Sequence, residues 1–126
     1  MNNIKLGNYF YNINPIDKGN FSFIYKGYDV KNNIPVAVKK NIYQNNTQIV
    51  NEINILKKLE HPNIIKIYDT HIDKTQYYFI MEFCHGGNLK DYIKSSDNQY
   101  DLKYMYEILA GLEYLINKKI IHRDIK

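Results

Sequence analysis

The sequence lacks several features that mark secreted and membrane proteins. Only one of its 126 residues is cysteine, Cys84, which excludes an internal disulfide and favours a reducing compartment. The N-terminus, which begins Met1-Asn2-Asn3-Ile4-Lys5, has no apolar core of signal-peptide length. No stretch approaches the roughly 18 apolar residues that span a bilayer. We therefore expect a soluble, intracellular, cytoplasmic protein with no membrane partner.

Arginine is nearly absent too. Arg123 is the single arginine among 17 basic residues, and no run of basic residues is longer than two. The net charge of +4 comes from scattered lysines, which argues against a nucleic-acid partner. The 13 tyrosines are spread along the chain, so we interpret them as core and surface residues.

The order of predicted elements indicates an α+β fold with an antiparallel sheet. With 44% hydrophobic and 24% charged residues, the chain is globular. Strand patterns cover residues 9–16, 23–30, 34–40, 64–68 and 77–83. Helical patterns run from residues 45–47 to a stop at 61–62, over 89–94, and over 101–117.

A glycine-containing segment joins the first two predicted strands. Gly19 and its neighbours would let backbone N–H groups approach phosphate oxygens that larger side chains hold away. Taken alone, such a segment is more often a simple turn.

The segment Val36-Ala37-Val38-Lys39 is more informative. On a strand, Ala37 and Lys39 share one face, while Val36 and Val38 take the other. A small residue beside a lysine suits a nucleotide whose ring stacks on Ala37 and whose phosphates contact Lys39. The alternative is a solvated lysine at the end of an edge strand.

Glu52 lies on the apolar side of its predicted helix, three residues after Ile49 and four before Leu56. Burying an unpaired carboxylate costs several kcal/mol, so a basic partner is expected, and Lys39 is a good candidate. The alternative is a carboxylate that reaches solvent from the edge of the stripe.

Together these segments resemble the first half of a eukaryotic-type protein kinase domain, of the serine/threonine kind. The resemblance covers nearly all of residues 9–126, and its motifs occur in the family's order. They are the glycine-rich loop, Val36-Ala37-Val38-Lys39, the helix glutamate, His61-Pro62-Asn63-Ile64, Met81-Glu82-Phe83-Cys84, Gly86-Gly87-Asn88-Leu89 and His122-Arg123-Asp124-Ile125-Lys126.

The resemblance implies a kinase N-terminal lobe, with a five-stranded antiparallel sheet and one helix, followed by the first helices of an incomplete C-terminal lobe. The implied domains are residues 1–83, which would bind the nucleotide, and 84–126, which would hold the hinge, two helices and the start of the catalytic loop. The implied activity is phosphoryl transfer from ATP to a protein hydroxyl.

The family's site roles fall on matching residues. The implied ATP-contacting residues are Ile16, Asp17, Lys18, Gly19, Asn20, Phe21, Ser22, Phe23, Ile24, Ala37, Lys39, Glu52, Met81, Glu82, Cys84 and Asn88. Asp124 would accept the substrate hydroxyl's proton and Lys126 would steady the γ-phosphate. Met81 would be the gatekeeper.

The sequence also departs from the family. Asp17 and Ser22 replace two loop glycines, and the negative charge of Asp17 would repel phosphates. The sequence stops before the catalytic-loop Asn and the Asp-Phe-Gly that supply magnesium ligands, so Mg²⁺ is expected for the family although its protein ligands are missing here. Transfer by this polypeptide alone is not expected.

The apolar face of residues 102–116 lacks the helices that cover it in the family. We therefore expect a loosely held segment after Gly87, or a partner protein that covers it. Two other functions stay open: a pseudokinase-like module that binds nucleotide or a partner without catalysis, and a decayed gene product.

Overall fold

The computed structural model describes residues 3–19, 22–42, 46–73, 76–85 and 101–120. Of residues 46–50, 52 and 101 it describes the backbone only. The chain divides into two compact units. One comprises residues 1–59 and 66–84, and the other residues 60–65 and 85–126. The domain boundaries at 83 and 84 stay a prediction.

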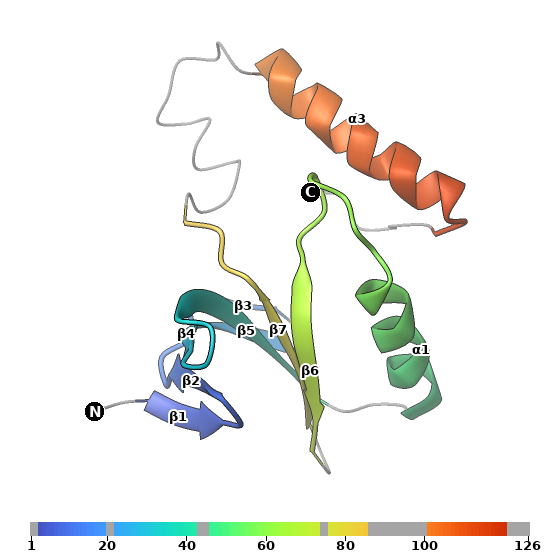
Figure 1. The fold of residues 1–126 in the computed structure, drawn as a ribbon. Coiled ribbons are helices and arrows are strands. Elements are labelled where there is room, and N and C mark those ends of the chain that lie inside the picture. The colour runs from blue at the N-terminus through green and yellow to red at the C-terminus, as the bar shows by residue number, and fades with distance from the viewer. Residues whose placement is uncertain (1–2, 20–21, 43–45, 74–75, 86–100, 121–126) are drawn as a thin grey trace. The chain divides into compact units, whose positions relative to one another are not determined.

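The first unit is an antiparallel sheet with one helix (Figure 1). Six of its seven strands follow the order β1-β2-β4-β5-β7-β6, and the seventh, β3, pairs with β4. The strands are β1 (Asn3–Leu6), β2 (Tyr9–Asn12), β3 (Asp17–Lys18), β4 (Ser22–Asp29), β5 (Ile34–Ile42), β6 (Ile67–Ile72) and β7 (Gln76–Glu82). Helix α1 (Asn46–Lys57) packs beside β6. The predicted antiparallel α+β arrangement is confirmed.

The central strands bury a different cluster on each face of the sheet. Val36 and Val38 of β5 are fully buried on one face, in a cluster with Ile80. Tyrosines from β2, β4 and β7 complete this first cluster: Tyr9, Tyr11, Tyr25 and Tyr78. The opposite face holds a second cluster, to which α1 contributes Ile53. Alternation along β5 therefore separates the two halves of the core.

The first predicted strand, residues 9–16, is shortened to β2 and ends at Asn12, and neither β1 nor β3, which begins at Asp17, was predicted. Asn12 Oδ1 accepts the Asn14 N–H at 2.9 Å, and Pro15 has no N–H for a ladder. These two features explain why the strand ends at Asn12. With β1 and β3 added, the sheet has seven strands instead of the five predicted.

The strand predicted over residues 64–68 is displaced to β6. The Ile64 N–H donates to the carbonyl of His61 at 3.1 Å, which makes a turn. Residues 60–65 belong to the second unit, where Asn63 and Ile64 lie against Gly111. Tertiary packing therefore outweighs the strand propensity of the isoleucines.

Helix α3 (Asp101–Asn117) dominates the second unit and matches its predicted range. Its Gly111 and Leu115 are buried, and the Tyr114 hydroxyl accepts the Glu60 N–H at 3.0 Å. No helix among the described residues is long and apolar enough to cross a membrane. The helix predicted over 89–94 lies outside the described residues.

Candidate functional site

The second cluster places three of the predicted nucleotide-contacting residues together. Ala37 and Met81 are buried members, and Ile24 packs against them. Ala37 and Met81 are direct partners across β5 and β7. A methyl group between two longer apolar side chains makes a narrow apolar surface of the kind that a flat ring stacks on.

Lys39 occupies the next position of β5 on this face. Its partners in the neighbouring strands are Ile24 and Phe79, both of which belong to the second cluster. Lys39 is half-buried, unlike a lysine at a sheet edge, and β5 lies between β4 and β7. The sheet thus carries a cation two residues along the strand from Ala37.

Glu52 lies in α1, one residue before Ile53, whose side chain is buried in the second cluster. Leu56, one turn later, packs against the same cluster. The backbone of Glu52 therefore lies in the helix that covers the face of Ala37. Its side chain is not among those described, and its pairing with Lys39 stays a prediction.

The glycine-containing hairpin connects β3 to β4. The Ile16 N–H donates to the carbonyl of Ile24 at 2.7 Å, and the Gly19 N–H donates to that of Ser22 at 2.8 Å. The predicted contacts Asn20 and Phe21, between those last two residues, lie outside the described residues. Each of these two backbone hydrogen bonds joins a residue before that gap to a residue after it, so together they close the hairpin.

The charge of Asp17 is engaged locally. Asp17 Oδ1 accepts the Lys18 N–H at 2.8 Å, and both side chains are exposed. A hydrogen bond from a backbone amide and full solvation both reduce the repulsion that this carboxylate would exert on an anion.

Phe23 points away from the other predicted contacts. It packs against the first cluster, with its ring centroid 6.5 Å from that of Tyr25. Its side chain is therefore on the opposite face from Ile24, as expected for consecutive residues of a strand. Only its backbone could serve the predicted site.

The predicted hinge follows Met81. The Glu82 N–H donates to the carbonyl of Lys66 at 2.9 Å, and Cys84 is exposed. Phe83 carries the Lys26 ammonium over its ring, with Nζ 5.2 Å from the centroid. Asn88, Asp124 and Lys126 lie outside the described residues.

Sequence reasoning missed two residues of this face, Lys26 and Phe79. Lys26 is the direct partner of Ala37 in β4, and Phe79 is 2% exposed in the second cluster. For Lys26 the sequence did offer a signal, because residues two apart on a strand share one face and Lys26 is two residues from Ile24. Phe79 had none, because Tyr77 to Met81 is apolar at every position and shows no alternation.

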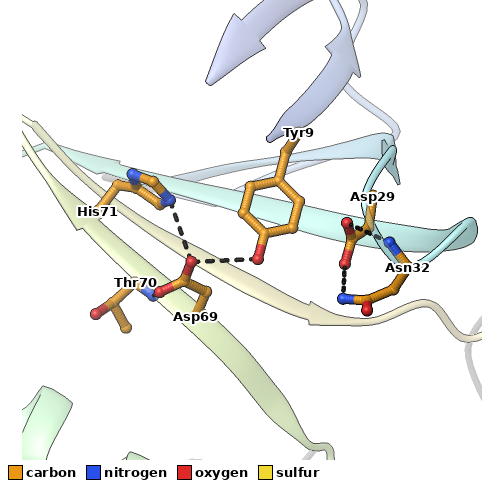
Figure 2. A network of polar contacts seen from close by, with 6 residues as sticks. All are labelled: Tyr9, Asp29, Asn32, Asp69, Thr70 and His71. Atoms are coloured by element: carbon orange, nitrogen blue, oxygen red, sulfur yellow. Dashed lines mark hydrogen bonds and ion pairs between the residues drawn. The ribbon is translucent and has the colours of Figure 1, made fainter. Parts of the chain in front are cut away.

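A separate polar network joins β2 to β6 (Figure 2). The Tyr9 hydroxyl donates to Asp69 Oδ2 at 3.2 Å, and His71 Nε2 lies 3.4 Å from the same oxygen. Asp69 Oδ1 accepts the Thr70 N–H at 2.8 Å. One carboxylate thus connects β6, at one end of the strand order, with β2, the second strand from the other end.

This network stabilises the fold and is unsuited to nucleophilic chemistry. Burial, followed by the charge and hydrogen bond of Asp69 and the charge of Asp29, raises the pKa of Tyr9 to about 12. A phenol with this pKa stays protonated near neutral pH and acts as a hydrogen-bond donor.

Comparison with known proteins agrees with this architecture. The model of the protein kinase domain family matches residues 10–126. A crystal structure of Rad53 1-466 in complex with AMP-PNP superposes with a TM-score of 0.87 at 25% identity, covering 94% of this chain and 33% of that one.

Sequence relatives are serine/threonine kinases. Serine/threonine-protein kinase atg1 of Dictyostelium discoideum is 36% identical over 122 residues, which are 86% of this chain and 18% of that protein. Calcium-dependent protein kinase 3 of Plasmodium berghei is 39% identical over 125 residues, which are 93% and 23%. The chain therefore spans less than a quarter of each of these relatives, and with its kinase-like fold it belongs to the serine/threonine protein kinases of the protein kinase domain family.

Proposed function

We propose that the chain binds ATP on the sheet face formed by Ile24, Ala37 and Met81. The observation that carries this proposal is the clustering of these three residues on one face, with Lys39 two residues beyond Ala37 on the same strand. The adenine ring would lie against Ile24 and Ala37, and Met81 would limit the depth of the slot. Residues 1–83 would then act as the nucleotide-binding lobe.

Hydrogen bonds at the ring edge would come from the backbone after Met81. The Glu82 N–H is already bonded to Lys66, so Glu82 would contribute its carbonyl, as an acceptor. Cys84 would contribute its N–H as a donor. One acceptor and one donor are what the edge of an adenine ring requires.

The phosphates would extend toward Lys39 and the hairpin at Gly19. Lys39 would contact the α- and β-phosphates, and Glu52 would hold its ammonium in place. The loop between Gly19 and Ser22 would cover the phosphates with backbone N–H groups.

In phosphoryl transfer to a serine or threonine of a protein substrate, Asp124 would accept the hydroxyl proton. Lys126 would steady the transferred group, and ATP supplies the phosphoryl group. The family uses Mg²⁺, yet within the described ranges no three His, Cys, Asp or Glu residues gather at one place.

A thermal-shift experiment with ATP tests the nucleotide site. We expect ATP to raise the melting temperature of the chain and Lys39→Ala to abolish the rise, because binding to the folded state alone stabilises it. Lys40→Ala is the matched control, since Lys40 is the adjacent lysine and its partners are Phe23 and Tyr78 of the first cluster. A shift that persists in Lys39→Ala contradicts the phosphate assignment.

A second function is favoured by α3. Its exposed apolar side chains would suit a module that binds nucleotide and a partner protein without catalysis. These side chains are Leu102, Met105, Tyr106, Leu109 and Ile116. Phosphate incorporation into a generic basic protein, lost in Asp124→Asn, would support the kinase. An ATP shift without incorporation would support the binding module. The absence of both would support the decayed gene product.

A further inference from the structure

A groove of about 530 Å³ lies on the first unit, beside the proposed nucleotide site. It crosses β1, β2, β4 and the start of β5. Its walls are Asn3, Phe10, Asn12, Asn14, Pro15, Ile16, Lys26, Gly27, Tyr28 and Pro35. Ile16 is the only one of these that we assign to ATP, so the groove offers a separate binding surface.

Two aromatic rings form the floor of the groove. Phe10 and Tyr28 are direct partners across β2 and β4, and they are 37% and 41% exposed. The Tyr28 hydroxyl donates to Asn33 Oδ1, which holds its ring in place. Pro15 and Pro35 add rigid apolar edges. This surface suits a flat apolar group, because stacking requires rings of fixed orientation.

The polar groups of the groove favour a negative charge. Among the described residues that line it, Lys26 is the one charged side chain and none is acidic. The Asn12 side-chain oxygen Oδ1 accepts the Asn14 N–H, so the side-chain NH₂ group is the end of this amide that can donate to a ligand. A cation and an amide donor beside two rings match an anion attached to an aromatic group.

We propose that this groove binds a planar aromatic carboxylate. The ring would stack on Phe10 and Tyr28, and the carboxylate would accept hydrogen bonds from Lys26 Nζ and the Asn12 amide. Lys26 also lies over Phe83, a residue of the predicted hinge, so it connects the two sites although it is not among the residues assigned to ATP. This goes beyond the proposed function, since the groove would bind whether or not ATP does.

Naphthoate is a suitable probe, measured by NMR titration of the 126-residue chain. We expect naphthoate to shift signals of the groove residues, and naphthalenemethanol, which has no charge, to bind roughly three- to fivefold more weakly. Lys26→Met should bring naphthoate down to the affinity of the alcohol. Lys66→Met is the matched control, because Lys66 also lies over an aromatic ring, 6.0 Å from that of Tyr68, and is outside the groove.

Two further measurements keep the proposal testable if Lys26→Met is unstable. Added sodium chloride should weaken naphthoate binding to the unmodified chain and leave the alcohol unaffected. Saturating ATP should leave naphthoate bound. Equal affinity for the acid and the alcohol, displacement by ATP, or no binding at millimolar concentration would each overturn the proposal. Of these outcomes, only displacement of naphthoate by ATP would also give information about the nucleotide site, because it would show that ATP and naphthoate compete.

Discussion

Among the glycines that the structure describes, Gly27 has the least room for a side chain. A Cβ atom at this position would lie 2.7 Å from the backbone oxygen of Phe10 and 3.1 Å from Val38 Cγ2. The first contact is with backbone, which cannot move without disturbing the pairing of β2 with β4. The pairing of β2 with β4 therefore requires a residue without a side chain at position 27.

We expect Gly27→Ala to lower the free energy of unfolding by roughly 1–3 kcal/mol, as overpacking does. Gly19→Ala is the control, because its one tight contact among the described residues would be the Ser22 hydroxyl, at 2.9 Å, and that side chain can rotate, while the Ser22 backbone oxygen lies at an ordinary 3.8 Å. Its cost should stay within about 0.5 kcal/mol. Urea unfolding of both variants measures the difference, and equal costs would contradict the packing argument.

At the scale of elements, the turn between β4 and β5 depends on one buried carboxylate. Asp29 is 2% exposed and accepts the Asn32 backbone N–H at 3.1 Å and the Asn32 side-chain amide at 2.7 Å. Burial alone would raise the pKa of Asp29, but hydrogen bonds from Asn32 and Lys31, with the charge of Lys31, lower it below its ordinary value of 3.8.

A lowered pKa means that the folded state favours the ionised form, so this stabilisation is present above pH 3.8 and is lost as the pH falls further. We expect Asp29→Asn to lower the free energy of unfolding by about 1–3 kcal/mol at neutral pH, and the gap to the unmodified chain to narrow below pH 3.8. Asp17→Asn, at an exposed position, is the control and should leave the free energy of unfolding at neutral pH nearly unchanged. A gap that is constant with pH would refute the charge argument.

The elements also differ in how far the sequence could predict them. Helix α3 and strand β5 were predicted because their apolar spacing is regular over many residues. The early end of the first strand depends on an Asx turn at Asn12, and the start of β6 on packing of Ile64 near Gly111. Both depend on contacts that residue spacing does not encode.

The same distinction applies to the site. The shared face of Ala37 and Lys39 follows from period-two alternation and was predicted correctly. The contact of Lys26 with Phe83 required knowledge of which strands are neighbours. Phe23 was assigned by its position in a motif, whereas its side chain follows the alternation of β4 to the opposite face.

For the whole chain, the two units differ in how much apolar surface they bury. The sheet holds two buried clusters, whereas α3 leaves Tyr106 and Ile116 about 70% exposed and buries Leu115. We expect the amides of α3 to exchange with solvent roughly tenfold or more faster than those of β5, because local opening exposes little additional apolar surface. Hydrogen exchange measured by mass spectrometry tests this, and equal protection would contradict it.

Tyrosines inside the sheet make the chain sensitive to alkali. Burial, as the largest cause, raises the pKa of Tyr9 and of Tyr11 to about 12 from an ordinary value of 10.0. Between these values the unfolded chain loses protons that the folded chain keeps, so stability falls as the pH rises from 10 to 12. We expect the double variant Tyr9→Phe/Tyr11→Phe to show a shallower fall in urea unfolding. If stability falls equally steeply with pH in the double variant, other groups cause the loss of stability at alkaline pH.

The bond from Tyr9 to Asp69 has a practical consequence for shortened versions of this protein. The match to the kinase family begins at residue 10, so a fragment trimmed to that match would omit the phenol that fastens the second strand to the sixth. Such a fragment would retain every residue proposed to contact ATP, but it would lack the hydrogen bond that joins β2 to β6. Loss of nucleotide affinity in it would report a weakened scaffold and leave the binding residues themselves untested.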